Sequence, residues 1–317
     1  MGRKIILDVD TGTDDAVAIM FAALHPELDL LGITTVNGNV ALANTTDNTL
    51  RVLDWIGRPD IPVHPGVPHP IARFGFPGGK HFEQGDENDP HGTELPIPAP
   101  STAARDTGAI EYLVETLRAT TEQITLVAVG PLSNIATALA VDPSVAGAVD
   151  ELVVMGGGHA VTNVSASAEF NIWADPEAAS VVFSAGFARR TLVTLDATHR
   201  ALIPQRTCEA LDALGTPAGT AAARFITRRI GAYEHTAVGA APVHDVVCTA
   251  YLVAPEVIST RHLPVAVETA SPLTVGRTVI DTRPDTELEP NAHIALDANA
   301  DLVNELLLST FARDVTS

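Results

Sequence analysis

Two alternating hydrophobic patterns run along the first two thirds of the chain. Short apolar runs rich in β-branched residues are followed by longer stretches whose apolar residues recur at helical spacing. The short runs predict strands at residues 5–9, 28–36, 124–129, 151–155 and 191–195. The longer stretches predict helices at residues 14–24, 41–55, 111–119, 134–140 and 176–184. This alternation predicts an α/β fold with an open, mostly parallel sheet that is covered by helices on both faces.

The last third of the chain is predicted to be mixed. Residues 204–234 have a mostly helical pattern, and further helices are expected at 245–253 and near 301–311, with strand-like runs at 263–269 and 274–281. No composition shift marks a domain boundary, so we expect a single domain over residues 1–317. One segment, residues 64–100, is rich in proline and glycine and lacks periodicity. Long loops in compact domains are often functional, so this segment is expected to be an active-site loop.

Composition narrows the classes of partner. The formal net charge is −20, and a surface with that charge repels phosphate backbones and anionic lipids, so neither nucleic acid nor membrane is an expected partner. No apolar run approaches the roughly 18 residues that span a bilayer, and the N-terminus lacks the pattern of a secretory signal. We therefore expect a cytoplasmic protein. Cys208 and Cys248 lack metal-ligand spacing and are expected to be buried thiols.

Four carboxylates gather where the first predicted strand meets the first predicted helix. The stretch DVDTGTDDA contains Asp8, Asp10, Asp14 and Asp15. A helix N-cap needs one such residue and not four. Four neighbouring carboxylates cannot all ionise easily without a cation, and oxygen ligands suit Ca²⁺ or Mg²⁺. In open α/β sheets this edge is where ligands bind, so the cluster is a candidate metal site.

Further motifs follow this stretch in order across nearly the whole chain. They are NGN at 37–39, VAVGPLSNIA at 127–136, MGGG at 155–158, AEFNIWADPEAA at 168–179 and PVHD at 242–245. With DVDTGTDDA, this set resembles the inosine-uridine preferring nucleoside hydrolases. The resemblance implies a nucleoside hydrolase-like, Rossmann-related fold and Ca²⁺-dependent hydrolysis of ribonucleosides to free base and ribose. It also implies a homodimer or homotetramer.

The resemblance assigns roles to matching residues. It implies that the carboxylates of Asp10, Asp15 and Asp245 and the carbonyl of Val129 bind Ca²⁺, and that Asp10 is the general base. Beside this metal set, His244 is expected to protonate the departing base, as in inosine-uridine and pyrimidine-preferring members. The residues expected to bind substrate, mostly through the ribose hydroxyls, are Asp14, Asn39, His91, Asn163, Glu169 and Asn171.

The base preference and the base pocket stay open at this stage. The segment around His91 keeps the family's His-Gly pair but not the glycine-rich stretch after it, so an unusual riboside is also compatible with the sequence. His81, Tyr233 and His235 are further candidates for this pocket. Two departures from the family pattern, Val246 and Val275, are expected to affect packing or an interface and not the chemistry.

Other functions are compatible with parts of the pattern. A haloacid-dehalogenase-like phosphatase also begins with a strand and two aspartates, but Gly12 occupies the place of its Thr or Val. That class also needs a downstream lysine, and the chain contains only Lys4 and Lys80. A non-catalytic nucleoside or ribose binder could keep the metal site, although a binder has no need of Asp10 as a base. A nucleoside phosphorylase would need basic residues for phosphate, which the acidic cluster opposes.

Overall fold

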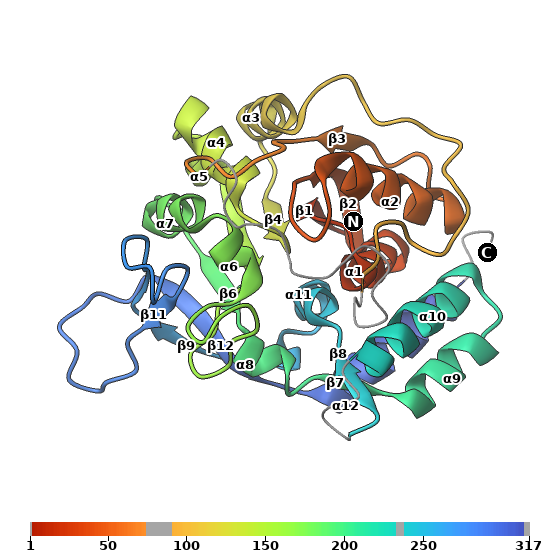
Figure 1. Ribbon diagram of the computed structural model, residues 1–317. Coiled ribbons are helices and arrows are strands. Elements are labelled where there is room, and N and C mark those ends of the chain that lie inside the picture. The colour runs from red at the N-terminus through yellow and green to blue at the C-terminus, as the bar shows by residue number, and fades with distance from the viewer. Residues whose placement is uncertain (1, 74–90, 233–237, 314–317) are drawn as a thin grey trace.

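A single large sheet organises the molecule. The computed structural model describes residues 2–73, 91–232 and 238–313, and its eight-stranded sheet has the order β3-β2-β1-β4-β5-β6-β12-β9 (Figure 1). All neighbouring strands pair in parallel except β12 and β9, which pair antiparallel. The strands are β1 (Arg3–Val9), β2 (Leu28–Thr35), β3 (Val63–Pro65), β4 (Ile124–Ala128), β5 (Val149–Met155), β6 (Arg190–Val193), β9 (Ile258–Leu263) and β12 (Ala292–Ala298).

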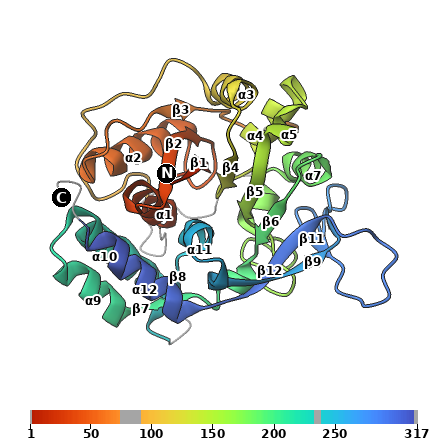
Figure 2. The same ribbon diagram turned by 180° about the vertical axis from the view of Figure 1, so that it is seen from behind.

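Helices cover both faces of this sheet, as the alternation predicts. The side chains of β1 alternate between two apolar cores, since Ile5 and Leu7 join one core and Ile6 joins the other. The face that Ile6 joins carries α3 (Ala109–Ala119), α4 (Ser133–Val141), α5 (Val145–Ala148) and α7 (Pro176–Ser184). The other face carries α1 (Thr13–Leu24), α2 (Leu42–Trp55), α9 (Gln205–Ala213), α10 (Pro217–Ala232), α11 (His244–Val253) and α12 (Ala300–Phe311), as Figures 1 and 2 show from opposite sides.

Smaller elements complete the described part of the chain. Two short antiparallel pairs lie outside the main sheet: β7 (Leu202–Pro204) with β8 (Ala240–Pro242), and β10 (Val265–Val267) with β11 (Thr278–Ile280). Short helices are α6 (Phe170–Ala174), α8 (Leu195–Thr198) and the 3₁₀ turn Pro255–Val257. Within the ranges described, every helix is too short or too polar to cross a membrane.

The observed elements confirm most of the predicted ones and correct the prediction in the tail. The run 274–281 forms a strand only over Thr278–Ile280. Neither β9 nor β12 was predicted from the sequence. Strand β3 lies at the start of the predicted loop, and residues 66–73 and 91–100 of that loop contain neither helix nor strand. Residues 74–90 lie outside the described ranges.

Candidate active site

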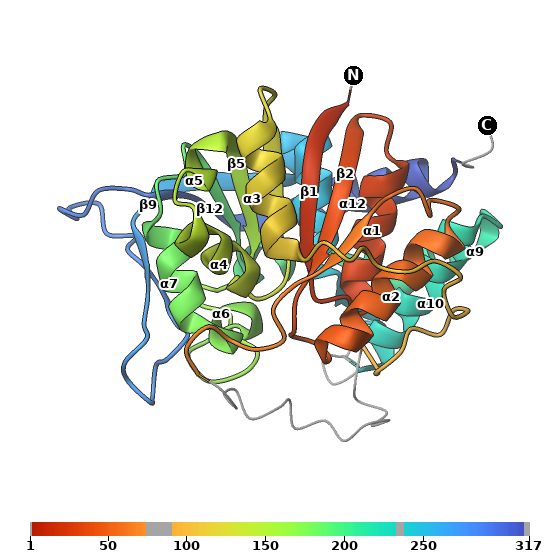
Figure 3. The ribbon, with the colours of Figure 1, turned by 90° about the horizontal axis from the view of Figure 1, so that it is seen from above.

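The predicted site residues lie at the carboxyl edge of the central strands. Strand β1 ends at Val9, Asp10 follows, and α1 begins at Thr13. Strands β1, β2, β4 and β5 run in parallel, so their carboxyl ends reach the same edge of the sheet. Figure 3 shows β1 and β2 side by side, with α1 next to them. The order of the chain therefore brings residues from distant segments to one edge.

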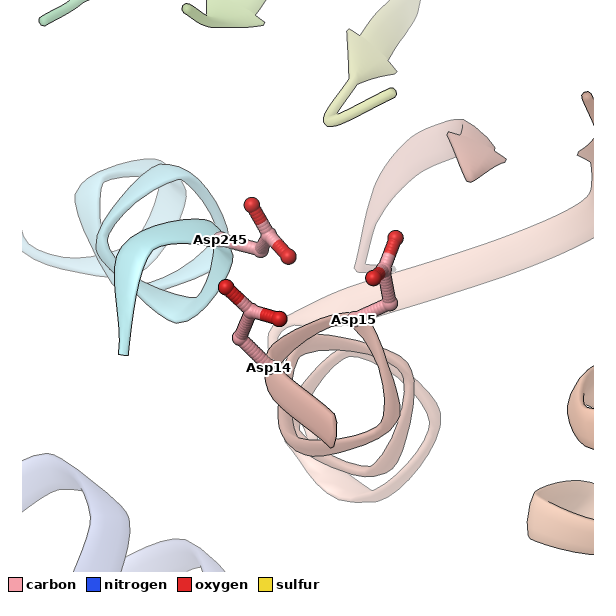
Figure 4. Close-up of side chains that lie close together, drawn as sticks. All are labelled: Asp14, Asp15 and Asp245. Carbon is pink, nitrogen blue, oxygen red and sulfur yellow. The ribbon is translucent and has the colours of Figure 1, made fainter. Parts of the chain in front are cut away.

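Three carboxylates meet there from two helices. Asp14 and Asp15 come from the first turn of α1, and Asp245 comes from the first turn of α11, which packs against α1 (Figure 4). One carboxylate oxygen of each lies within 4.8 Å of the other two, and all three residues are buried. We call Asp14, Asp15 and Asp245 the acidic cluster. Buried carboxylate oxygens this close together form the hard ligand set that Ca²⁺ and Mg²⁺ prefer, so the cluster is able to hold a metal ion.

The electrostatics of the cluster favour a cation. Burial, followed by the charge of Asp14, raises the pKa of Asp15 to about 7. Burial and then the charges of Asp14, Asp15 and Asp10 raise the pKa of Asp245 well above its ordinary value. Both shifts have the same sign because desolvation and like charge each disfavour the ionised form. A divalent cation would reverse both effects by stabilising the ionised carboxylates.

Asp10 lies next to this cluster in a tightly defined position. Its Oδ2 accepts the backbone N–H of Asn39 at 2.6 Å, and its own N–H donates to Asp15 Oδ1 at 3.2 Å. A Cβ on Gly38 would collide with Asp10 Oδ2, and a Cβ on Gly130 would lie 2.9 Å from Oδ1. Two glycines therefore allow two loops to enclose the carboxylate. The Asn39 side chain also donates to Asp15 Oδ2 at 3.2 Å, which links the predicted base to the cluster.

Val129 is positioned by the strand beside it. Its N–H donates to the Asp8 carbonyl at 2.9 Å, and its carbonyl accepts the Asn171 side-chain amide at 2.8 Å. Asp8 itself is fully buried and accepts hydrogen bonds from Thr34 at 2.5 Å and Asn134 at 2.7 Å. Burial nevertheless raises the pKa of Asp8 to about 6. Asp8 thus links β1 to β2, to α4 and to the residue after β4 beneath the site.

The predicted ribose-binding residues after β5 are connected to one another. Glu169 is the N-cap of α6, where Oε1 accepts the N–H of Asn171 at 2.8 Å. Its Oε2 accepts the N–H of Gly157 at 2.8 Å, which ties the MGGG turn to the helix. Asn163 lies on an exposed loop, and its side-chain oxygen accepts the N–H of Phe170 at 2.9 Å. Backbone capping therefore orients Glu169 and Asn163 around Asn171.

His244 is held in place by α8. Its Nδ1 lies 2.7 Å from Thr198 Oγ1, and both residues are buried. Thr198 Oγ1 also donates to the Leu195 carbonyl at 3.4 Å, which makes it the acceptor for a proton on Nδ1. The His199 ring lies 5.6 Å from the His244 ring, and burial lowers the pKa of His199. The fixed Nδ1 directs the other ring nitrogen, Nε2, away from Thr198.

Two basic side chains lie against Asp14. His91 Nδ1 lies 3.5 Å from Asp14 Oδ1 and accepts the N–H of Thr13 at 3.3 Å, so the residue predicted to contact substrate also joins its loop to α1. Arg229 Nη1 lies 3.0 Å from the same Asp14 oxygen. The sequence did not single out Arg229, because an arginine in an amphipathic helix is usually solvated. His81, Tyr233 and His235 lie outside the described residues.

Comparisons with known proteins place this geometry in a family. The profile of the inosine-uridine preferring nucleoside hydrolases matches residues 5–305. The pyrimidine-specific ribonucleoside hydrolase RihB of Escherichia coli (strain SE11) is 40% identical over 281 residues, which cover 88% of this chain and 87% of that protein.

Solved structures agree with the sequence comparison. The plant nucleoside hydrolase PpNRh1 is 28% identical, with a TM-score of 0.87 over 98% of this chain and 99% of that one. The purine-preferring ribonucleoside hydrolase from Gardnerella vaginalis is also 28% identical, with a TM-score of 0.88 over 98% of each chain.

The chain belongs to the inosine-uridine preferring nucleoside hydrolase family. It is an N-glycosyl hydrolase that acts on ribonucleosides. The expected family, fold and enzyme class are therefore confirmed, and the phosphatase and binding-protein alternatives are not favoured.

Proposed function

We propose that this enzyme hydrolyses pyrimidine ribonucleosides to base and ribose in a Ca²⁺-dependent reaction. The observation that carries the proposal is the buried acidic cluster, which lies beside Asp10 at the carboxyl edge of the sheet. The pyrimidine preference is supported by RihB, a pyrimidine-specific relative at 40% identity, whereas the purine-preferring structure is 28% identical. A cytoplasmic location, a single domain and a homodimer or homotetramer stay predictions from the sequence.

The residues proposed to hold the ion are Asp10, Asp15, Asp245 and the carbonyl of Val129. All four supply oxygen, and all are buried. A bound Ca²⁺ supplies a water of lowered pKa and a fixed position for that water. Val129 is oriented by its N–H, which donates to the Asp8 carbonyl, and by its carbonyl, which accepts the Asn171 side-chain amide. The proposed ligands therefore come from the ends of two strands and from the first turns of two helices.

Proton removal is assigned to Asp10. The Asn39 N–H fixes its Oδ2, and the two glycines at positions 38 and 130 leave no space for a side chain against the carboxylate. A base held in this way needs little reorganisation when it takes a proton from the attacking water. As the glycosidic bond breaks, positive charge develops on the ribose, and neighbouring carboxylates stabilise that charge.

Ribose recognition is assigned to Asp14, Asn39, Asn163, Glu169 and Asn171, with His91 beside them. Asp14 belongs to the cluster itself, Asn39 follows the end of β2, and the other three residues follow the end of β5. Sites that hydrogen-bond a hydroxyl strongly reject analogues that lack it. We therefore expect ribonucleosides to be cleaved and 2′-deoxyribonucleosides to be rejected.

Protonation of the departing base is assigned to His244. Because Nδ1–H is engaged by Thr198, His244 gives a proton to the base from Nε2, which carries one when the ring is an imidazolium. This geometry suits a pyrimidine or hypoxanthine leaving group, which departs more easily when a ring atom is protonated.

Ribose release from a panel of nucleosides tests the proposal. The panel contains uridine, cytidine, inosine, adenosine and their 2′-deoxy forms, each with and without a Ca²⁺ chelator. We expect uridine and cytidine to be cleaved fastest, the deoxy forms to be inert, and chelation to stop the reaction until Ca²⁺ is restored. Purine nucleosides cleaved fastest would overturn the base preference, and unchanged rates in chelator would overturn the metal dependence.

A further inference from the structure

Arg229 is the largest fully buried side chain in the described part of the molecule, and it lies at the active site. It comes from α10, and its side chain is 1% exposed. Its Nε donates to the Pro242 carbonyl at 3.0 Å, just before the HD pair of α11. Its Nη1 donates to Thr13 Oγ1 at 3.3 Å and lies 3.0 Å from Asp14 Oδ1. One guanidinium therefore joins α10 to the starts of α1 and α11.

A buried guanidinium needs an anion, and here the anion is a member of the acidic cluster. Burial without a counter-charge would cost several kcal/mol, and Asp14 is the carboxylate in ion-pair contact with Arg229. Asp15 is held differently, because its oxygens accept the N–H groups of Asp10 and Gly12. Within the cluster, Asp14 is thus the member in ion-pair contact with Arg229, whose charge also acts on Asp245 without such a contact.

Distance alone does not decide which carboxylates bind the ion. The three oxygens of the cluster lie within 4.8 Å of one another, so Asp14 is placed to coordinate as readily as Asp15 or Asp245. Asp14 is also the residue expected to hold a ribose hydroxyl, and one carboxylate oxygen cannot serve both partners equally well. The ion pair with Arg229 distinguishes Asp14 from the other two, since a cation paired with this carboxylate opposes the binding of a second cation to it.

We infer that Arg229 is a positioning residue that keeps Asp14 out of the metal's ligand set and reserves it for the ribose. This inference rests on the proposed function, because it assigns each carboxylate of that same site either to the metal or to the ribose. Asp10, Asp15 and Asp245 supply the charge for the ion, and the Arg229–Asp14 pair stays neutral beside them. Loss of the arginine alone turns Asp14 into an additional ligand and removes it from the sugar.

Calcium titration by calorimetry, without nucleoside and at one pH, measures whether Asp14 contributes to Ca²⁺ binding. Arg229→Met should bind Ca²⁺ roughly tenfold more tightly, because an unbalanced carboxylate joins the site. Asp14→Asn should bind more weakly, because it leaves an unbalanced arginine near the ion. The double variant removes the neutral pair and should return to within about threefold of the wild type.

The double variant is decisive. If Asp14 is a metal ligand in the wild type, removing the pair deletes a ligand, and affinity should fall by more than the 10- to 100-fold that outer-shell changes cost. That result would overturn the inference. Arg224→Met on the exposed side of α10 is the control for lost positive charge, and it should leave both Ca²⁺ affinity and uridine turnover unchanged.

Two further measurements cover other outcomes. At saturating Ca²⁺, Arg229→Met should raise the KM for uridine at least tenfold with a smaller change in kcat, and an unchanged KM would contradict the role in ribose binding. If Arg229→Met does not fold, a crystal structure of the wild type with Ca²⁺ decides. An Asp14 oxygen at about 2.3–2.6 Å from the ion would refute the inference, and a longer separation with the Arg229 contact retained would support it.

Failure of this inference can be separated from failure of the proposed function. A wild-type protein that binds no Ca²⁺ or releases no ribose contradicts the proposed function. A wild type that does both, with a double variant that binds Ca²⁺ weakly, contradicts only the assignment of Arg229.

Discussion

The two edges of the central sheet bury carboxylates in opposite ways. At the amino edge, Glu151 of β5 accepts hydrogen bonds from Arg3 at 2.7 Å, Thr191 at 2.6 Å and Tyr251 at 2.9 Å, and Arg189 at 2.9 Å completes the set. At the carboxyl edge, the members of the acidic cluster face one another. The same chemical group is therefore satisfied by donors at one edge and crowded by like charge at the other.

This difference separates a structural carboxylate from a functional one. The hydroxyl and guanidinium donors outweigh burial at Glu151 and lower its pKa. Burial and neighbouring charge raise the pKa of Asp15 and Asp245. Buried carboxylates that repel one another destabilise the protein without a ligand, and a bound cation would remove this repulsion. Carboxylates with strongly shifted pKa values therefore indicate a binding site.

The comparison predicts the largest effect for Asp10. Replacing it with alanine should lower kcat for uridine by about 10² to 10⁴ or more, because a general base and a ligand are both lost. The free energy of unfolding of the metal-free protein should not fall, since one like charge is removed from the site. Steady-state kinetics and chemical denaturation check both halves. A variant that keeps most of its turnover would remove Asp10 from the mechanism.

Glu151→Ala should lower the stability of the protein and leave its turnover unchanged, which is the reverse of the effect expected for Asp10→Ala. Removing one partner of a buried ionic network costs about 3 kcal/mol, so the free energy of unfolding should fall by that order while turnover per folded molecule stays the same. Urea denaturation measures the loss. Glu122→Ala at the same edge is the control, because the exposed Glu122 pairs with Lys4 at 3.2 Å and should contribute under about 1 kcal/mol. Equal losses of unfolding free energy in the two variants would show that Glu151 contributes no more to stability than an exposed carboxylate.

Thr198→Val should lower the rate of uridine cleavage by altering His244, without destabilising the fold. Loss of the hydroxyl leaves Nδ1 without its fixed partner, so the rate with uridine should fall about tenfold, within the range of outer-shell changes. A riboside whose leaving group needs no proton, such as p-nitrophenyl riboside, should be cleaved at the normal rate. Thr198→Ser should restore uridine cleavage. Equal losses with both substrates would show that Thr198 supports the structure only.

The two edges also respond to pH with opposite sign. The pKa of Asp15 is raised from 3.8 to about 7, so its contribution to stability is complete below about pH 4 and is lost as pH rises through about 7. The pKa of Glu151 is lowered, so its contribution is present above its ordinary value of 4.5 and is lost in acid. The Tm of the metal-free protein should therefore decline by a few degrees between pH 5 and pH 8.

Variants at each edge test this pH assignment. Asp15→Asn should flatten the decline in Tm between pH 5 and pH 8, whereas Glu151→Gln should leave it in place. Added Ca²⁺ should raise Tm more at pH 8 than at pH 5, because the ion binds the ionised carboxylates. A Tm that rises between pH 5 and pH 8 without metal would contradict the assignment.

Local pattern was enough to predict the layers of the fold and the crowding of carboxylates after the first strand, whereas Asp245 was predicted only from the resemblance to the family. The strand before Asp10 and the helix after it are continuous in sequence, and parallel strands must end at one edge. The strand β9 was missed because its sequence, ISTRHL, has buried residues only at its two ends. It becomes a strand by pairing with β12, which is a long-range contact that no local pattern contains.

Arg229 shows why part of the site could not be predicted. Arg228 and Arg229 are adjacent in sequence, and Arg229 alone is buried, because α10 packs against α1 with that side inward. The docking of two helices separated by about two hundred residues decides which arginine meets Asp14. Thr198 is similar, since its partner His244 comes from a distant helix.

The enclosure of Asp10 limits how this enzyme can be re-engineered. Any residue larger than glycine at position 38 would collide with the carboxylate, and one at position 130 would press on its other oxygen. A mutant library that includes either position would consist mainly of inactive clones, whatever substrate it was selected for. Diversity is better placed at positions whose side chains do not contact the Asp10 carboxylate.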